Sequence, residues 1–152
     1  MAIWNILHVL GMFIAFAFTT GVGIFLTAIA NTREVRTIRA ATKIGRSLQT
    51  AGIAMLLVGV VFGFATAGAA GYSLTSRWLI ESYVLVGLLV IVGAGVHGTW
   101  LARLAKAAAA SPDDHPSPEL AAVVGDRLVR IAGPVSGLIW IALIAVMILR
   151  PS

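Results

Sequence analysis

The chain has 152 residues, of which 59% are hydrophobic and only 11% charged, and its formal net charge is +5. Soluble domains carry about 25% charged residues, so this composition excludes an ordinary soluble protein, and the length leaves no room for a separate soluble catalytic domain. Because the sequence contains no cysteine, it also excludes disulfides, thiolate metal sites and cysteine nucleophiles.

Four long stretches of the chain lack Asp, Glu, Lys and Arg, namely residues 1–32, 47–76, 82–102 and 131–149. A membrane-spanning helix needs about 20 apolar residues to cross roughly 30 Å of hydrocarbon. We therefore predict an all-α integral membrane protein, a four-helix bundle formed by one transmembrane domain over residues 1–152. The predicted spans are about 3–29, 47–71, 79–104 and 131–149.

Small residues recur at every fourth position in the first two predicted spans, and such stripes allow helices to approach closely. The first stripe is Gly11, Ala15, Thr19, Gly23 and Thr27, and the second is Gly59, Gly63, Ala67 and Gly71. We interpret residues 3–29 as a span and not a signal peptide. No basic residue precedes the stretch, and it far exceeds the 7–15 apolar residues of a signal peptide.

The first connection, residues 31–46, carries basic residues every three or four positions: Arg33, Arg36, Arg39, Lys43 and Arg46. On a helix these residues form one broad arc. The pattern predicts either that the first two helices extend beyond the membrane or that a short interfacial helix joins them. The arc is interpreted as a lipid-facing anchor, and alternatively as a site for anionic lipid headgroups or for a partner's acidic surface.

Residues 111–118, SPDDHPSP, contain three prolines and are predicted to form a loop. Ser117, Pro118 and Glu119 are typical of a helix start, with a capping hydroxyl, a proline and an acid in the first turn. We expect an amphipathic interfacial helix over residues 118–131, followed by a kink or break at Gly133–Pro134 before the last span.

Charge distribution predicts how the chain is threaded. Nine of the eleven Lys and Arg residues lie in the first and third gaps between the uncharged stretches. Connections rich in Lys and Arg stay in the cytoplasm, so residues 31–46 and 103–130 are predicted to be cytoplasmic and both termini outside (N-out/C-out) in a plasma-membrane protein. The same argument explains the basic excess without any nucleic-acid partner.

Three ionisable residues, His8, Glu81 and His97, lie within the predicted spans, where such residues are functional candidates. At 1.5 Å per residue, His8 lies roughly 8 Å from the outer end of its helix and His97 roughly 27 Å from the outer end of its own. The two histidines are therefore expected to be separated by about 20 Å along the membrane normal. They could not bind one metal ion or opposite faces of one haem.

Each histidine then needs partners at its own depth. An outer cluster of His8, Met12, Glu81 and Met147 would offer imidazole and thioether ligands that suit copper. Further in, His97 and Met55 could hold a b-type haem. The simpler interpretation is that these residues only pack, and that Glu81 pairs with Arg77 four residues away.

The segments WNILHVLGMF, GYSLTSRWL and RIAGPVSGLI resemble those of small bacterial four-helix integral membrane proteins of unknown function. More remotely, the plan resembles the membrane domain of copper resistance protein D and the haem-binding membrane proteins that oxidise protoporphyrinogen. In the remoter resemblance only His8 matches the placement of an early histidine. The third span has no lysine matching the oxidase pattern.

We therefore predict an integral membrane protein of unknown activity, most simply a non-catalytic accessory or structural module. The alternative is a redox or metal-handling protein that holds haem b or copper through His8, His97 or both. The sequence contains no phosphate loop, HExxH, CxxC or GxSxG motif that would indicate an enzyme. Expected partners are the lipid bilayer and a second copy or a larger membrane complex.

Overall fold

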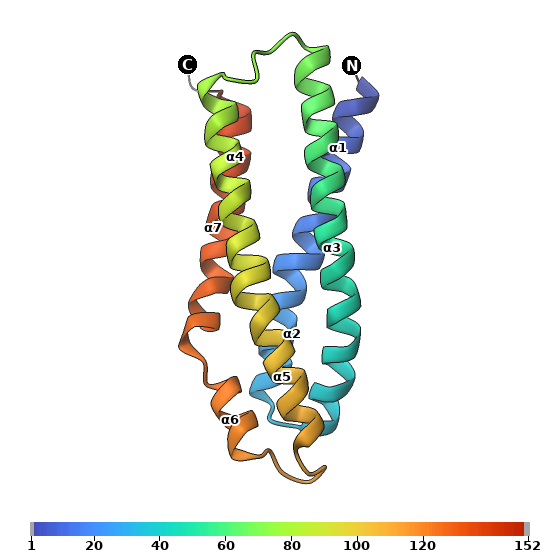
Figure 1. Ribbon diagram of the computed structural model, residues 1–152, viewed down its shortest axis with the longest axis vertical. Coiled ribbons are helices and arrows are strands. Elements are labelled where there is room, and N and C mark those ends of the chain that lie inside the picture. Colours follow the sequence, from blue (N-terminus) through green and yellow to red (C-terminus); the bar gives the residue numbers. More distant parts are fainter. Residues whose placement is uncertain (1, 151–152) are drawn as a thin grey trace.

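Four long helical rods make up the computed structural model, which describes residues 2–150 (Figure 1). The first rod is α1 (Ala2–Phe16), a π-helical segment (Ala17–Gly21) and α2 (Val22–Asn31), and the second is α3 (Val35–Ala69). The third is α4 (Arg77–Val90), a π-helical segment (Ile91–Gly98) and α5 (Thr99–Ala110), and the fourth is α6 (Pro118–Val124) and α7 (Arg127–Leu149). No strand occurs in the described part of the chain.

All four rods have the length and hydropathy needed to cross a membrane, over Ala2–Thr32, Val35–Ala69, Arg77–Ala110 and Pro118–Leu149. Bulky apolar side chains cover their outer faces, as a bilayer requires; Phe13 is 68% exposed and Ile141 64%. The prediction of an all-α protein with four membrane-spanning helices is confirmed. All four helices begin before their predicted spans, but α3 ends at Ala69, two residues short of the predicted end at residue 71.

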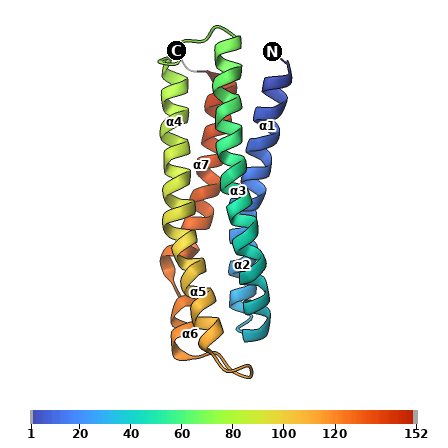
Figure 2. The ribbon, with the colours of Figure 1, turned by 45° about the vertical axis from the view of Figure 1, so that its right-hand side comes forward.

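The rods are arranged as two antiparallel pairs, α1 along α3 and α4 along α7 (Figures 1 and 2). Glycine makes the first pair close, because a Cβ atom added to Gly11 would lie 3.0 Å from the Cα of Gly59. This contact joins the two stripes of small residues predicted from the sequence. Both chain termini lie at the same end of the bundle (Figure 1).

Two apolar clusters stabilise the bundle at different heights. One lies toward the end formed by α2, α5 and α6, and its fully buried side chains include Ile38, Trp100 and Leu120. The other contains Met12, Leu56, Trp140 and Leu143, and it joins α1 and α3 to α4 and α7. Above this second cluster, toward the termini, the two helix pairs are less closely packed.

The first connection is much shorter than residues 31–46. Only residues 32–34 leave the helical conformation, and Arg33 adopts a left-handed φ of 61°. The two helices therefore extend past their apolar stretches, which is the first of the two predicted alternatives, and no separate interfacial helix joins them.

The prediction for residues 118–131 is wrong in its bounds. Ser117 caps α6 as expected, with its hydroxyl accepting a hydrogen bond from the Leu120 N–H, but α6 ends at Val124. Asp126 then caps α7 by accepting from the Leu128 N–H. The break therefore falls at Gly125–Asp126, because a second capping residue follows a weak helix former. No break occurs at Pro134, which lies inside α7.

Candidate functional site

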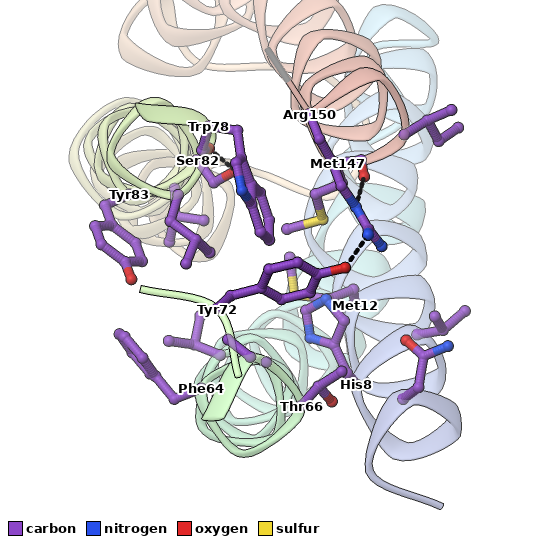
Figure 3. A pocket seen from close by; sticks show the side chains of 18 residues that line it. His8, Met12, Phe64, Thr66, Tyr72, Trp78, Ser82, Tyr83, Met147 and Arg150 are labelled. Atoms are coloured by element: carbon purple, nitrogen blue, oxygen red, sulfur yellow. Dashed lines mark hydrogen bonds between the residues drawn. The ribbon is translucent and has the colours of Figure 1, made fainter. Parts of the chain in front are cut away.

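A cleft of about 510 Å³ lies between the two helix pairs near the chain termini (Figure 3). It is lined by α1 and α3 on one side and by α4 and the end of α7 on the other. A second hollow of about 520 Å³, between α1 and α7, shares His8, Met12 and Met147 with it. Ligand pockets are typically clefts of about 300–1,000 Å³ with a few placed polar groups, so this cleft has the size of a binding site.

His8 supplies an oriented imidazole to the cleft. Its Nδ1 atom lies 2.6 Å from the Gly59 carbonyl oxygen. A carbonyl only accepts hydrogen bonds, so Nδ1 carries the hydrogen, and Nε2 of the neutral ring keeps its lone pair. Gly63 makes room for the ring, because a Cβ atom there would lie 3.0 Å from His8 Cε1 and Nδ1.

The structure brings together three of the four residues predicted for an outer cluster. His8 and Met12 of α1 and Met147 of α7 line the same cleft (Figure 3). Glu81 does not line it, and its Oε1 atom accepts a hydrogen bond of 2.8 Å from Arg77 Nε. That pairing is the simpler interpretation that the sequence offered for Glu81.

Aromatic and basic side chains lie at the end of the cleft nearest the chain termini. Tyr72, from the connection between α3 and α4, lies across the cleft with its hydroxyl directed at Arg150 (Figure 3). Tyr72 and Trp78 pack edge to face, with ring centroids 5.4 Å apart. These residues place polar groups at this end of a cleft that is lined mainly by apolar side chains, and we call this end the mouth of the cleft.

His97 lies in a different place and is only 7% exposed. It lines a small cavity of about 50 Å³ with Gln49, and its ring packs on Gly23, where a Cβ atom would lie 3.5 Å from Cδ2. Met55 does not line this cavity. Within residues 2–150, the cleft lined by His8 and the cavity lined by His97 share no lining residue.

Polar side chains join the rods around this small cavity. The Gln49 amide donates to the Gly93 carbonyl over 3.2 Å, within the π-helical segment Ile91–Gly98. On the far side Trp140 Nε1 donates to Thr20 Oγ1 over 3.1 Å, and Thr20 Oγ1 and Ser136 Oγ lie 2.9 Å apart. These contacts satisfy buried polar groups in the middle of the bundle, close to the cavity that His97 lines.

At the opposite end, two of the five basic residues predicted to face lipid bind the loop that follows α5. The Arg39 guanidinium donates to the Ala108 carbonyl over 2.8 Å and also binds the Ser111 carbonyl and the Asp113 carboxylate. Arg36 Nε lies 3.1 Å from Asp113. Arg33, Lys43 and Arg46 are exposed, and within residues 2–150 no ion pair involves them.

We expect the substitution Asp113→Asn to lower the thermal stability slightly at neutral pH. Hydrogen bonding by Arg39, with the charge of Arg36, holds the pKa of the Asp113 carboxyl below its usual value of 3.8. A lowered pKa stabilises the fold above that usual value, and the contribution disappears as the pH falls through the folded-state pKa. Melting curves of wild type and variant in detergent should differ at pH 7 and converge in acid. A difference that persists in acid would contradict this origin.

Residues 2–151 match the protein family described as "Predicted integral membrane protein (DUF2269)". The chain belongs to this family. No curated protein and no solved structure shows significant similarity to the chain. Membership in DUF2269 confirms the closer of the two resemblances and agrees with the four apolar helices, and the family description names no activity. The likeness to copper resistance protein D stays a prediction.

Sequence reasoning missed three residues of these sites: Gln49, Tyr72 and Arg150. Ionisable residues within spans are the usual functional candidates, whereas Gln49 is an uncharged amide at the start of the second uncharged stretch. Arg150 lies just beyond the last uncharged stretch and was counted only in the charge balance. The signal for Tyr72 and Arg150 was their shared depth, since both adjoin span ends on the same side of the predicted bundle.

Proposed function

We propose that the protein is a non-catalytic membrane module that binds an apolar molecule from the bilayer in the cleft between its helix pairs. The observation that carries the proposal is the cleft of about 510 Å³, whose lining is apolar apart from a few polar groups. Val9 and Ile148 line the cleft and are also exposed on the outer faces of α1 and α7. The cleft thus opens to the side, where lipid molecules are found.

The polar groups of the cleft favour binding over catalysis. His8 is the one imidazole among the described residues that line the cleft. Its Nδ1 atom is already occupied by the Gly59 carbonyl. Acid–base catalysis commonly pairs such a base with a carboxylate, and no carboxylate lines the cleft within residues 2–150. A single imidazole with a fixed orientation suits a ligand contact.

Filling the cleft should abolish binding. We expect Val60→Trp, whose side chain would enter the cleft, to lose a lipid or other apolar molecule that remains bound to the purified wild-type protein. Val61→Trp is the matched control, because Val61 is 63% exposed on the outer face of the same helix and does not line the cleft. Native mass spectrometry of protein released from mild detergent measures the bound molecules. Equal retention by both variants would contradict the proposal.

One specific observation favours a second candidate, haem b bound through His8. The hydrogen bond from Nδ1 to Gly59 leaves Nε2 free, which is the arrangement that orients a metal-binding histidine. The cleft has room for a macrocycle, and Met147 brings a thioether from α7. The cavity beside His97, at about 50 Å³, is far smaller than the roughly 300 Å³ of typical ligand pockets. Haem, when bound, would supply redox chemistry.

An absorption spectrum and elemental analysis of the purified protein test this second candidate. A Soret band that is lost in His8→Ala and kept in His97→Ala would support haem at His8. Bound copper without a Soret band would instead favour the ligand set of His8, Met12 and Met147. Absence of both would exclude haem and copper without affecting the binding of an apolar molecule.

We also propose that the basic end of the bundle is cytoplasmic and that the protein resides in the plasma membrane. The support is the clustering of nine of the eleven Lys and Arg residues in two connections that the structure places away from the chain termini. In this threading α6 lies near the cytoplasmic interface and the cleft opens in the outer leaflet. The test is a reporter that is active only in the cytoplasm, fused to the C-terminus. Activity of this reporter would overturn the proposed threading.

A further inference from the structure

Arg150 is held at the mouth of the cleft by two aromatic rings. Its Cζ atom lies 4.9 Å from the centroid of Tyr72 and 5.6 Å from that of Trp78. The guanidinium also donates to the Tyr72 hydroxyl, and its Nε donates to the Met147 carbonyl over 3.4 Å. Both rings line the cleft (Figure 3), so the positive charge is fixed where the apolar interior meets the membrane surface.

The charge of Arg150 is not neutralised by the described part of the protein. The five ion pairs within residues 2–150 do not include it. Glu81, in the first turns of α4 at the same end of the bundle, is already paired with Arg77 over 2.8 Å. Counting residues 2–150, the mouth carries a net positive charge, and an arginine fork that is partly used retains donors for a further anion.

A cation at the mouth and an apolar interior below it match an anionic amphiphile. We propose that the cleft binds an anionic phospholipid, with the phosphate on Arg150 and one acyl chain extending past Tyr72 toward Met12 and Met147. This inference rests on the proposed function and specifies its ligand. A zwitterionic lipid would bring its own cation to the same place, so the net charge at the mouth selects against it.

The site differs from the basic arc predicted to anchor the protein. Arg33, Lys43 and Arg46 are exposed at the opposite end of the bundle, near the start of α3 (Figure 1), and line neither the cleft nor the cavity beside His97. At Arg150 the cation and the cleft are joined, because Tyr72 contacts the guanidinium and lines the cavity. Such a site holds individual lipid molecules and does not merely attract a charged surface.

The test is a competition between two lipids with identical acyl chains. Purified protein is equilibrated in nanodiscs containing equal amounts of phosphatidylglycerol and phosphatidylcholine, and native mass spectrometry measures which lipid stays bound. One basic residue near a membrane surface contributes about 1 kcal/mol, so we expect phosphatidylglycerol to be retained about fivefold over phosphatidylcholine. The preference should fall to about one in Arg150→Gln and persist in Arg150→Lys.

The double substitution Arg77→Gln/Glu81→Gln is the control, because it removes an ion pair at the same end without changing the net charge, and neither residue lines the cleft. It should leave the preference unchanged. A wild-type protein that retains both lipids equally, or an equal loss of preference in the Arg77→Gln/Glu81→Gln control, would overturn the assignment to Arg150 and leave the apolar cleft intact. Retention of neither lipid by the wild type would contradict the proposed function itself.

Discussion

Replacing Trp100 by alanine is expected to lower the free energy of unfolding by about 3–5 kcal/mol, the cost typical of removing a buried tryptophan side chain. Trp100 is 2% exposed and belongs to the cluster that contains Ile38 and Leu120. Its Nε1 atom donates to the Val123 carbonyl of α6 over 3.0 Å. The substitution therefore removes both the apolar contact and the hydrogen bond that joins α6 to α5.

Two further variants separate these contributions. Trp100→Phe keeps most of the apolar contact and loses the hydrogen bond, so it should cost about 1–3 kcal/mol. Trp4→Ala is the control, because Trp4 is 41% exposed and stacks only on Phe62 in the described structure. Unfolding by a denaturing detergent in mixed micelles measures all three. Equal losses in Trp100→Ala and Trp4→Ala would contradict the placement of Trp100 in the core.

Replacing Gly11 by valine should separate α1 from α3 and cost about 1–3 kcal/mol or more, the range of overpacked sites. A Cβ atom at position 11 would lie 3.0 Å from Gly59 Cα and 3.1 Å from Gly59 N. Both neighbours are backbone atoms, so they cannot move aside as a flexible side chain could. The shift of α1 would also weaken the hydrogen bond between His8 and the Gly59 carbonyl.

The control for Gly11→Val is Gly68→Ala in α3, where nothing lies within 4 Å of an added Cβ atom. Because alanine is the better helix former, this variant should be as stable as the wild type or slightly more so. The same unfolding assay compares the two. If Gly11→Val unfolded like Gly68→Ala, close packing between Gly11 and Gly59 would be refuted.

Features encoded by local patterns were predictable from the sequence. The length of the apolar stretches predicted four membrane-spanning helices. The two stripes of small residues, one beginning at Gly11 and the other at Gly59, predicted close helix packing. Chain direction predicted that His8 and His97 lie at different distances along the membrane normal. The structure places the two residues in separate cavities. Each of these follows from periodicity along one helix, or from chain direction, and needs no knowledge of neighbouring helices.

What escaped prediction depends on contacts between distant residues. The end of α6 depends on Asp126 capping a new helix, which overrides the continuous amphipathic pattern of residues 118–131. The binding of Ser111 and Asp113 by Arg39 joins positions more than seventy residues apart. Arg150 and Tyr72 meet only because α7 returns beside the α3–α4 connection. Contacts of this kind leave no periodic pattern in the sequence of either segment.

In the function that we propose, the ligand reaches the cleft from the side, between Val9 and Ile148. A molecule that enters there never leaves the hydrocarbon phase, so its poor solubility in water does not slow its arrival. Encounter occurs by lateral diffusion in two dimensions, and the relevant concentration is the mole fraction of the ligand in one leaflet. Occupancy of such a site therefore reports membrane composition directly, whatever the concentration of the same molecule in the surrounding solution.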